Sequence, residues 1–96
     1  MYGTIMRGKL DPGARDAFLA AVSNDRVAIA GYRSSYLMFP ESDEDEVCLV
    51  VFFDDRDSYM KNADDPAQHE RYLAFRAHLT EDPTWTDGEW RPFEAD

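Results

Sequence analysis

The chain has 96 residues, of which 44% are hydrophobic and 14% aromatic, so we expect residues 1–96 to form one folded domain with its own core. Twenty acidic residues against ten basic ones give a formal net charge of −10, which repels phosphate backbones and anionic lipids. Neither nucleic acid nor a membrane is therefore an expected partner. With no membrane-length apolar run and no signal-peptide pattern, the expectation is a soluble, cytoplasmic protein.

The single cysteine, Cys48, lies in the apolar run "VCLVVFF". One cysteine excludes an intramolecular disulfide and a CxxC-type zinc or redox site. The apolar neighbours predict a small buried thiol, with a reactive thiol as the alternative.

The first third of the chain reads as a strand followed by a helix. "YGTIMRGKL" is rich in β-branched and aromatic residues and predicts a strand at 2–10. Asp11 is the expected N-cap of a helix, with Pro12 at its first position. Helical spacing then gives one apolar stripe, and "SNDR" at 23–26 is the expected end of that helix. The stripe consists of Ala14, Ala17, Phe18, Ala21 and Val22.

The middle of the chain predicts two strands joined by an acidic loop. Residues 28–40 are aromatic and end at Pro40, and residues 47–53 are continuously apolar. Six polar residues, "ESDEDE", separate them, which favours an antiparallel hairpin. The loop lacks the glycine and oxygen spacing of a calcium loop, so we expect it to be a solvated connection.

The last third predicts a helix broken in two and a final strand. Asp54 or Asp55 is the expected cap of a short helix, and Asp65 with Gln68 fits a capping box for the next. That second helix carries an apolar stripe and is expected to close at Asp82. The stripe contains Tyr72, Phe75 and Leu79, with Leu73 beside it. "WTDGEWRPF" predicts a short strand with a turn at Asp87-Gly88.

The resulting order, β-α-β-β-α-β, predicts an α+β domain of ferredoxin-like arrangement: an antiparallel sheet with both helices on one face. The third strand is apolar on both sides, whereas a sheet with one solvated face alternates apolar and polar residues. Because the helices cover only one face, Cys48, Val50 and Phe52 need another cover. We therefore expect a homodimer, sheet against sheet. The alternative is a central strand that tolerates apolar exposure.

These features, together with the stretch "FFDDRDSYMKNADDPAQHERY", resemble the antibiotic biosynthesis monooxygenase (ABM) domain family. The resemblance runs from "MYGTIMRG" to "WTDGEW" and implies a dimeric α/β barrel with a small-molecule pocket between sheet and helices. The family includes cofactor-free oxygenases of polycyclic aromatics, haem-degrading oxygenases, isomerases and proteins of no assigned activity.

The resemblance implies a small-molecule-binding protein, and a cofactor-independent monooxygenase of an aromatic or polycyclic substrate is the leading hypothesis. His69 or Tyr72 would then accept the proton, and Arg76 would steady a developing oxyanion. Tyr36 and Tyr59 would form walls of the substrate site. The last substrate-binding candidate is Asn62. No cofactor and no metal site are expected.

Two other readings stay open. In the first, the chain is a non-catalytic binding or dimerisation module, and His69 is a structural histidine bonded to a carboxylate. The second is haem oxygenation, whose branch of the family places a tryptophan ten residues before the histidine ligand and an asparagine in the first strand. Here Tyr59 stands at that place and the first strand lacks asparagine, so this reading is the weaker one. Of the remaining candidates, His78 is expected to be exposed. Trp85 and Trp90 are expected to serve the dimer contact or a strand tail that crosses to the partner.

Overall fold

The computed structural model describes residues 1–22 and 29–94, which form four strands and three helices. In chain order these are β1 (Tyr2–Lys9), α1 (Arg15–Val22), β2 (Tyr32–Met38), β3 (Glu46–Phe53), α2 (Arg56–Ala63), α3 (Pro66–Arg76) and β4 (Thr84–Glu89). The predicted order β-α-β-β-α-β, with its second helix broken in two, is confirmed.

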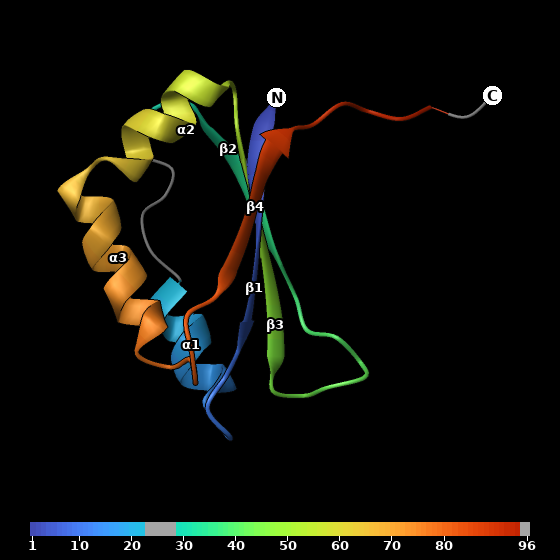
Figure 1. Ribbon diagram of the computed structural model, residues 1–96, viewed down its shortest axis with the longest axis vertical. Helices are drawn as coiled ribbons and strands as arrows, with labels where there is room; N and C mark the ends of the chain where they lie inside the picture. The colour runs from blue at the N-terminus through green and yellow to red at the C-terminus, as the bar shows by residue number, and fades with distance from the viewer. Residues whose placement is uncertain (23–28, 95–96) are drawn as a thin grey trace.

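The strands form one antiparallel sheet in the order β2-β3-β1-β4, and β2 and β3 are the predicted hairpin. All three helices lie on the same side of the sheet (Figure 1). This arrangement confirms the predicted ferredoxin-like fold.

The core lies between the helices and the inner face of the sheet. Met6 of β1 and Phe53 of β3 meet Phe18 of α1 and Phe75 of α3, and each of these side chains is at most 2% exposed. The rings of Phe18 and Phe75 pack edge to face at 5.9 Å. The apolar stripes of α1 and α3 thus meet on the apolar side of β1 and β3.

The outer face of the sheet is also apolar, and no helix of the described residues covers it (Figure 1). The ring of Phe52 lies between those of Trp90, at 4.8 Å, and Tyr36, at 6.3 Å. Tyr36 is 65% and Met38 52% exposed, whereas Cys48 is buried as expected. We call the side chains of Tyr36, Met38, Phe52 and Trp90 the outer aromatic patch.

Several local predictions need correction. Asp11 and Pro12 form a turn, not the helix start, and α1 begins only at Arg15. Gly13 makes this turn possible because its φ of 78° belongs to the left-handed region. The predicted helix end at 23–26 and the first residue of the predicted strand at 28–40 lie outside the described residues. The described strand begins at Tyr32.

The predicted caps of α2 and α3 are confirmed, except for the capping box. Asp55 accepts a bond from the Ser58 amide at 2.8 Å, and Asp65 accepts one from the Ala67 amide at 2.9 Å. The Gln68 side chain does not return to the cap; its Oε1 accepts a bond from Asn62 Nδ2 instead. The helix N-terminus is therefore closed by Asp65 alone, and Gln68 is free for another role.

The end of the chain also differs from the prediction. α3 ends at Arg76, well before Asp82. Gly88 lies inside β4 opposite Gly3, so Asp87-Gly88 is paired strand and not a turn. Within residues 1–22 and 29–94, no helix is long and apolar enough to span a membrane.

Candidate functional site

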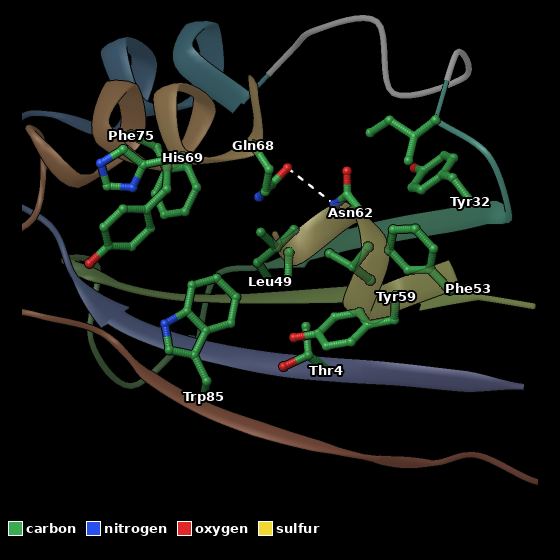
Figure 2. Close-up of a pocket in the computed structure, with 14 residues that line it drawn as sticks. Thr4, Tyr32, Leu49, Phe53, Tyr59, Asn62, Gln68, His69, Phe75 and Trp85 are labelled. Carbon is green, nitrogen blue, oxygen red and sulfur yellow. Dashed lines mark hydrogen bonds between the residues drawn. The ribbon is translucent and has the colours of Figure 1, made fainter. Parts of the chain in front are cut away.

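An open pocket of about 260 Å³ lies between the inner face of the sheet and helices α2 and α3 (Figure 2). Its volume is just below the range of about 300–1,000 Å³ usual for small-molecule sites, which suits a compact ligand. Fourteen residues line it: Thr4, Ile29, Tyr32, Leu49, Val51, Phe53, Tyr59, Asn62, Ala63, Gln68, His69, Tyr72, Phe75 and Trp85.

The sheet supplies a mostly apolar floor. Leu49, Val51 and Phe53 alternate along β3, and their register brings Thr4 and Trp85 beside them from β1 and β4. Thr4 is 2% exposed, but its hydroxyl donates to the Thr86 carbonyl at 3.3 Å, so this buried polar group is satisfied. A flat apolar molecule would meet carbon atoms on this side.

The break between α2 and α3 supplies the polar groups. Asp65 and Pro66 restart the helix, and this places Asn62 at the end of α2 next to Gln68 in the first turn of α3. Asn62 Nδ2 donates to Gln68 Oε1 at 3.3 Å (Figure 2), and the same oxygen accepts from Arg71 at 3.3 Å. Because that oxygen is occupied twice, the Nε2 hydrogens of Gln68 are the donors left for a ligand.

Tyr59 joins the helix layer to the sheet. Its ring packs edge to face on Phe53 at 5.6 Å, and its hydroxyl donates to Asp87 Oδ1 of β4 at 2.9 Å. Burial, followed by this bond to a carboxylate, raises the pKa of Tyr59 to about 12. The phenol therefore stays protonated at neutral pH and acts as a wall, not as a base.

His69 and Tyr72 stand one helical turn apart on α3, and both line the pocket. His69 is exposed, whereas Tyr72 is half-buried and contacts Phe75 at 5.3 Å and Trp85 at 6.3 Å between ring centroids. Histidine is the side chain that exchanges protons most readily near neutral pH. An imidazole at the rim can pass a proton between a bound molecule and water.

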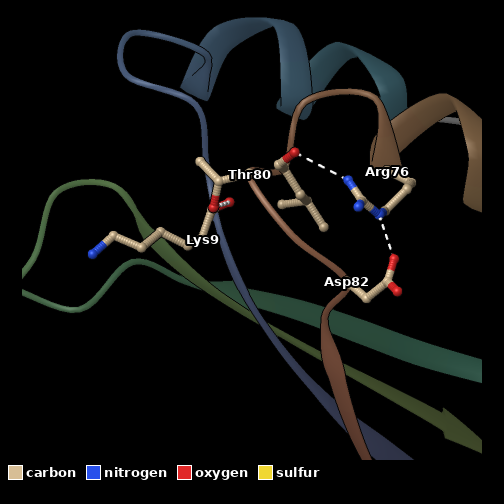
Figure 3. A network of polar contacts seen from close by, with 5 residues as sticks. Lys9, Arg76, Thr80 and Asp82 are labelled. Atoms are coloured by element: carbon tan, nitrogen blue, oxygen red, sulfur yellow. Dashed lines mark hydrogen bonds and ion pairs between the residues drawn. The ribbon is translucent and has the colours of Figure 1, made fainter.

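The pocket thus brings together four of the six predicted site residues, Tyr59, Asn62, His69 and Tyr72. Tyr36 lies on the opposite face of the sheet, in the outer aromatic patch. Arg76 points to the chain after α3: its Nε donates to Asp82 Oδ1 at 2.9 Å and its Nη1 to the Leu79 carbonyl at 3.0 Å (Figure 3). The bond to Asp82 raises the pKa of Arg76.

The sequence analysis missed two pocket-lining residues, Trp85 and Gln68, which contribute to the shape and the hydrogen bonding of the pocket. Trp85 was expected at a dimer contact, yet it pairs with Met6 and so faces the helices. Trp90 packs on Phe52 on the outer face of the sheet and lies an odd number of residues after Trp85. Because successive side chains of a strand point to opposite faces, this odd spacing is a signal that the two tryptophans lie on opposite faces. Gln68 was missed because the capping box explained it. His78 is half-buried, not exposed as expected, and does not line the pocket.

No group of three or more His, Cys, Asp and Glu side chains within the described parts of the chain is placed to hold a metal ion. The polar side-chain groups of the lining residues are instead two amides, an imidazole, phenols, the indole N–H of Trp85 and the hydroxyl of Thr4. Such groups orient a ligand by hydrogen bonds and move protons.

Comparisons with known proteins agree with this architecture. Residues 1–77 match the sequence profile of the family described as "Antibiotic biosynthesis monooxygenase". No curated protein sequence matches the chain.

Solved structures share the fold at low sequence identity. SnoaB, a cofactor-independent oxygenase from Streptomyces nogalater, superposes with a TM-score of 0.80 at 13% identity over 99% of this chain and 97% of its own. A protein given the family's name from Bordetella bronchiseptica has a TM-score of 0.81 at 18% identity, over 95% and 97%. Another from Chloroflexus aurantiacus J-10-fl has 0.72 at 19%, over 96% of both chains.

Proposed function

The chain belongs to the antibiotic biosynthesis monooxygenase family, and on this premise we propose that it is a homodimeric, cofactor-independent monooxygenase of a compact aromatic substrate. The observation that carries the proposal is the pocket itself, which combines aromatic walls with the imidazole of His69. SnoaB, which shares the fold, is a cofactor-independent oxygenase. The fold alone does not determine an activity, so the proposal depends on the side chains.

The proposed reaction converts an acidic CH₂ group of an aromatic ring system into a carbonyl. His69 removes a proton, and the resulting carbanion gives its electrons to molecular oxygen. One oxygen atom stays on the carbon as the carbonyl, and the other leaves as water with the two hydrogen atoms of the CH₂ group. The substrate is the reductant, so the protein's part is to orient the ring, exclude water and move protons.

The pocket residues divide these tasks. Tyr59, Phe53 and Trp85 hold the ring system, and the Nε2 hydrogens of Gln68 donate to the oxygen that becomes negatively charged. Gln68 takes over the role expected for Arg76, because Arg76 is bound to Asp82 outside the pocket. Tyr72 stands next to His69 as a second hydrogen-bonding group.

The homodimer is proposed from the outer face of the sheet. An aromatic patch of this kind on an acidic protein calls for a cover, and a second copy of the same face supplies one. The two sheets would then enclose a barrel, with one helix-side pocket in each subunit.

Oxygen uptake with anthrone tests the reaction. We expect wild-type protein to consume oxygen, His69→Ala to lose at least about tenfold in kcat/KM, and His78→Ala to keep the wild-type rate. His78 is the matched control because it follows α3 and does not line the pocket. If anthrone binds but His69→Ala is as fast as wild type, the proton-transfer role is wrong. If it binds without any oxygen uptake, the chain is a binding protein of this fold.

A further inference from the structure

A second, smaller cavity of about 170 Å³ adjoins the pocket on the side of α2 and the first turns of α3. The two cavities share Ile29 and Asn62 as lining residues. A ligand in the pocket can therefore extend a substituent past Asn62 into this second space.

The second cavity carries positive charge in a chain that is otherwise strongly acidic. Lys61 and Arg71 both line it. The ion pairs within residues 1–22 and 29–94 use Lys9, Arg33, Arg76 and Arg91, so neither of the two cations is neutralised by a partner there. Two cations at one cavity, neither of them in an ion pair with a described residue, favour the binding of an anion.

Arg71 is held in place but has donors to spare. It is half-buried, and its Nη1 donates to Gln68 Oε1 at 3.3 Å. A guanidinium has five N–H donors, and two parallel ones match the oxygens of a carboxylate. The bond to Gln68 therefore positions Arg71 and leaves most of its fork available.

One acidic side chain, Asp65, also lines the second cavity. Its Oδ1 accepts the bond from the Ala67 amide that caps α3, so it is tied to the helix end. Two cations against this one carboxylate leave the cavity positive.

Gln68 connects the two spaces, because it lines the pocket while its side chain accepts from Arg71. We propose that the ligand of the pocket is an aromatic carboxylic acid, whose ring system lies between sheet and helices and whose carboxylate binds Arg71 and Lys61. This inference rests on the aromatic-ligand site proposed above and names its substrate class.

Binding of a hydroxynaphthoate and of the matching hydroxynaphthamide, measured by calorimetry, tests this substrate class. The two probes differ in one substituent, which is a negatively charged carboxylate in the acid and a neutral carboxamide of similar size in the amide. We expect wild-type protein to bind the acid about tenfold more tightly than the amide, as one charge-assisted pair would give. Arg71→Gln should abolish this preference while the amide binds as before, and Lys61→Gln should reduce it.

Two further variants sharpen the measurement. Arg56→Gln removes one positive charge from the start of α2, outside both cavities, and should keep the full preference. Asp65→Asn keeps a capping side chain but removes the opposing carboxylate, so it should strengthen binding of the acid and leave that of the amide unchanged.

The outcomes separate this inference from the proposed reaction. Equal binding of acid and amide to the wild type, or a preference that survives Arg71→Gln, overturns the carboxylate site and leaves the oxygenase proposal standing. A preference that depends on Arg71, in protein that consumes no oxygen with anthrone, supports the carboxylate site and overturns the oxygenase. If neither naphthalene probe binds, the carboxylate site is overturned, and oxygen uptake with anthrone alone decides the oxygenase proposal.

Discussion

At the scale of single residues, Tyr59 shows how one side chain serves both fold and pocket. Its ring packs against those of Phe53 and Tyr2, and its hydroxyl donates a hydrogen bond to Asp87 of β4. Burial in this position favours the neutral phenol, and the neighbouring carboxylate favours it further. The same contacts that give the pocket an aromatic wall therefore keep that wall uncharged.

The raised pKa of Tyr59 predicts a loss of stability at alkaline pH. The folded state holds the phenolic proton up to about pH 12, whereas the unfolded chain releases it near the ordinary value of about 10. This contribution is fully present below about pH 10 and is lost as the pH rises through about 12. Urea unfolding should give a lower free energy of unfolding above this pH window than below it.

Tyr59→Phe is the matched control for this drop. The variant keeps the ring but has no ionisable proton, so the part of the drop due to Tyr59 should be missing. Identical pH profiles for wild type and variant would contradict the assigned cause.

Residue types alone did not show which side chains meet at the pocket. His69, Tyr72, Asn62 and Tyr59 were predicted because the resemblance to the ABM family implies side chains of this chemistry around a substrate. Tyr36 and Arg76 also have suitable chemistry. Strand register, however, places Tyr36 on the outer face, and Arg76 donates a hydrogen bond to Asp82 outside the pocket. Such placements depend on tertiary pairing, which a local pattern does not contain.

At the scale of elements, the break between α2 and α3 builds the site. Without Asp65 and Pro66 the helix would run on, and Asn62 would not stand beside Gln68. The Asp-Pro pair was predictable from the sequence because both residues favour a helix start for local reasons. The role of Gln68 was not, since its partners Asn62 and Arg71 come from both sides of the break.

Removal of the α3 cap should therefore weaken the whole fold. Asp65→Ala leaves the Ala67 amide without its acceptor and should lower the free energy of unfolding by about 1 kcal/mol, measured by urea denaturation. Asp65→Asn retains an acceptor oxygen and should stay within a few tenths of a kcal/mol of wild type. A full loss in Asp65→Asn as well would show that the charge, not the cap, is what stabilises α3.

Local pairs of residues were less reliable signals at two other places. At Asp11-Pro12 the glycine that follows takes a φ of 78° and delays the helix to Arg15. At Asp87-Gly88 a turn-like pair lies inside β4, because Gly88 pairs with Gly3 of β1. Long-range pairing outweighs turn preference there.

At the scale of the whole molecule, the helices cover one face of the sheet, and no helix of the described residues covers the other (Figure 1). The apolar character of β3 on both sides was visible in the sequence and correctly indicated an outer apolar surface. The structure adds the aromatic row of Tyr36 in β2, Phe52 in β3 and Trp90 just after β4, which therefore has no local sequence pattern.

The proposed dimer predicts that a charge on the outer face separates the subunits. Wild-type protein should sediment at twice the 11.0 kDa of one chain, and Met38→Glu should sediment as a monomer. Leu73→Glu on α3 is the matched control, because Leu73 is 50% exposed and Met38 52%, but only Met38 lies on the sheet. A wild-type monomer, or a Met38→Glu dimer, would contradict sheet-to-sheet assembly.

The two tryptophans allow the most direct test of where an aromatic ligand binds. Trp85 lines the pocket and Trp90 lies on the outer face, so each reports on one side of the sheet. The measurement is a fluorescence titration with a hydroxynaphthoate, excited at the tryptophan band, on Trp90→Phe and Trp85→Phe. The pocket account predicts saturable quenching in Trp90→Phe, which keeps Trp85, and none in Trp85→Phe. Quenching only of Trp90, or of neither residue, would contradict it.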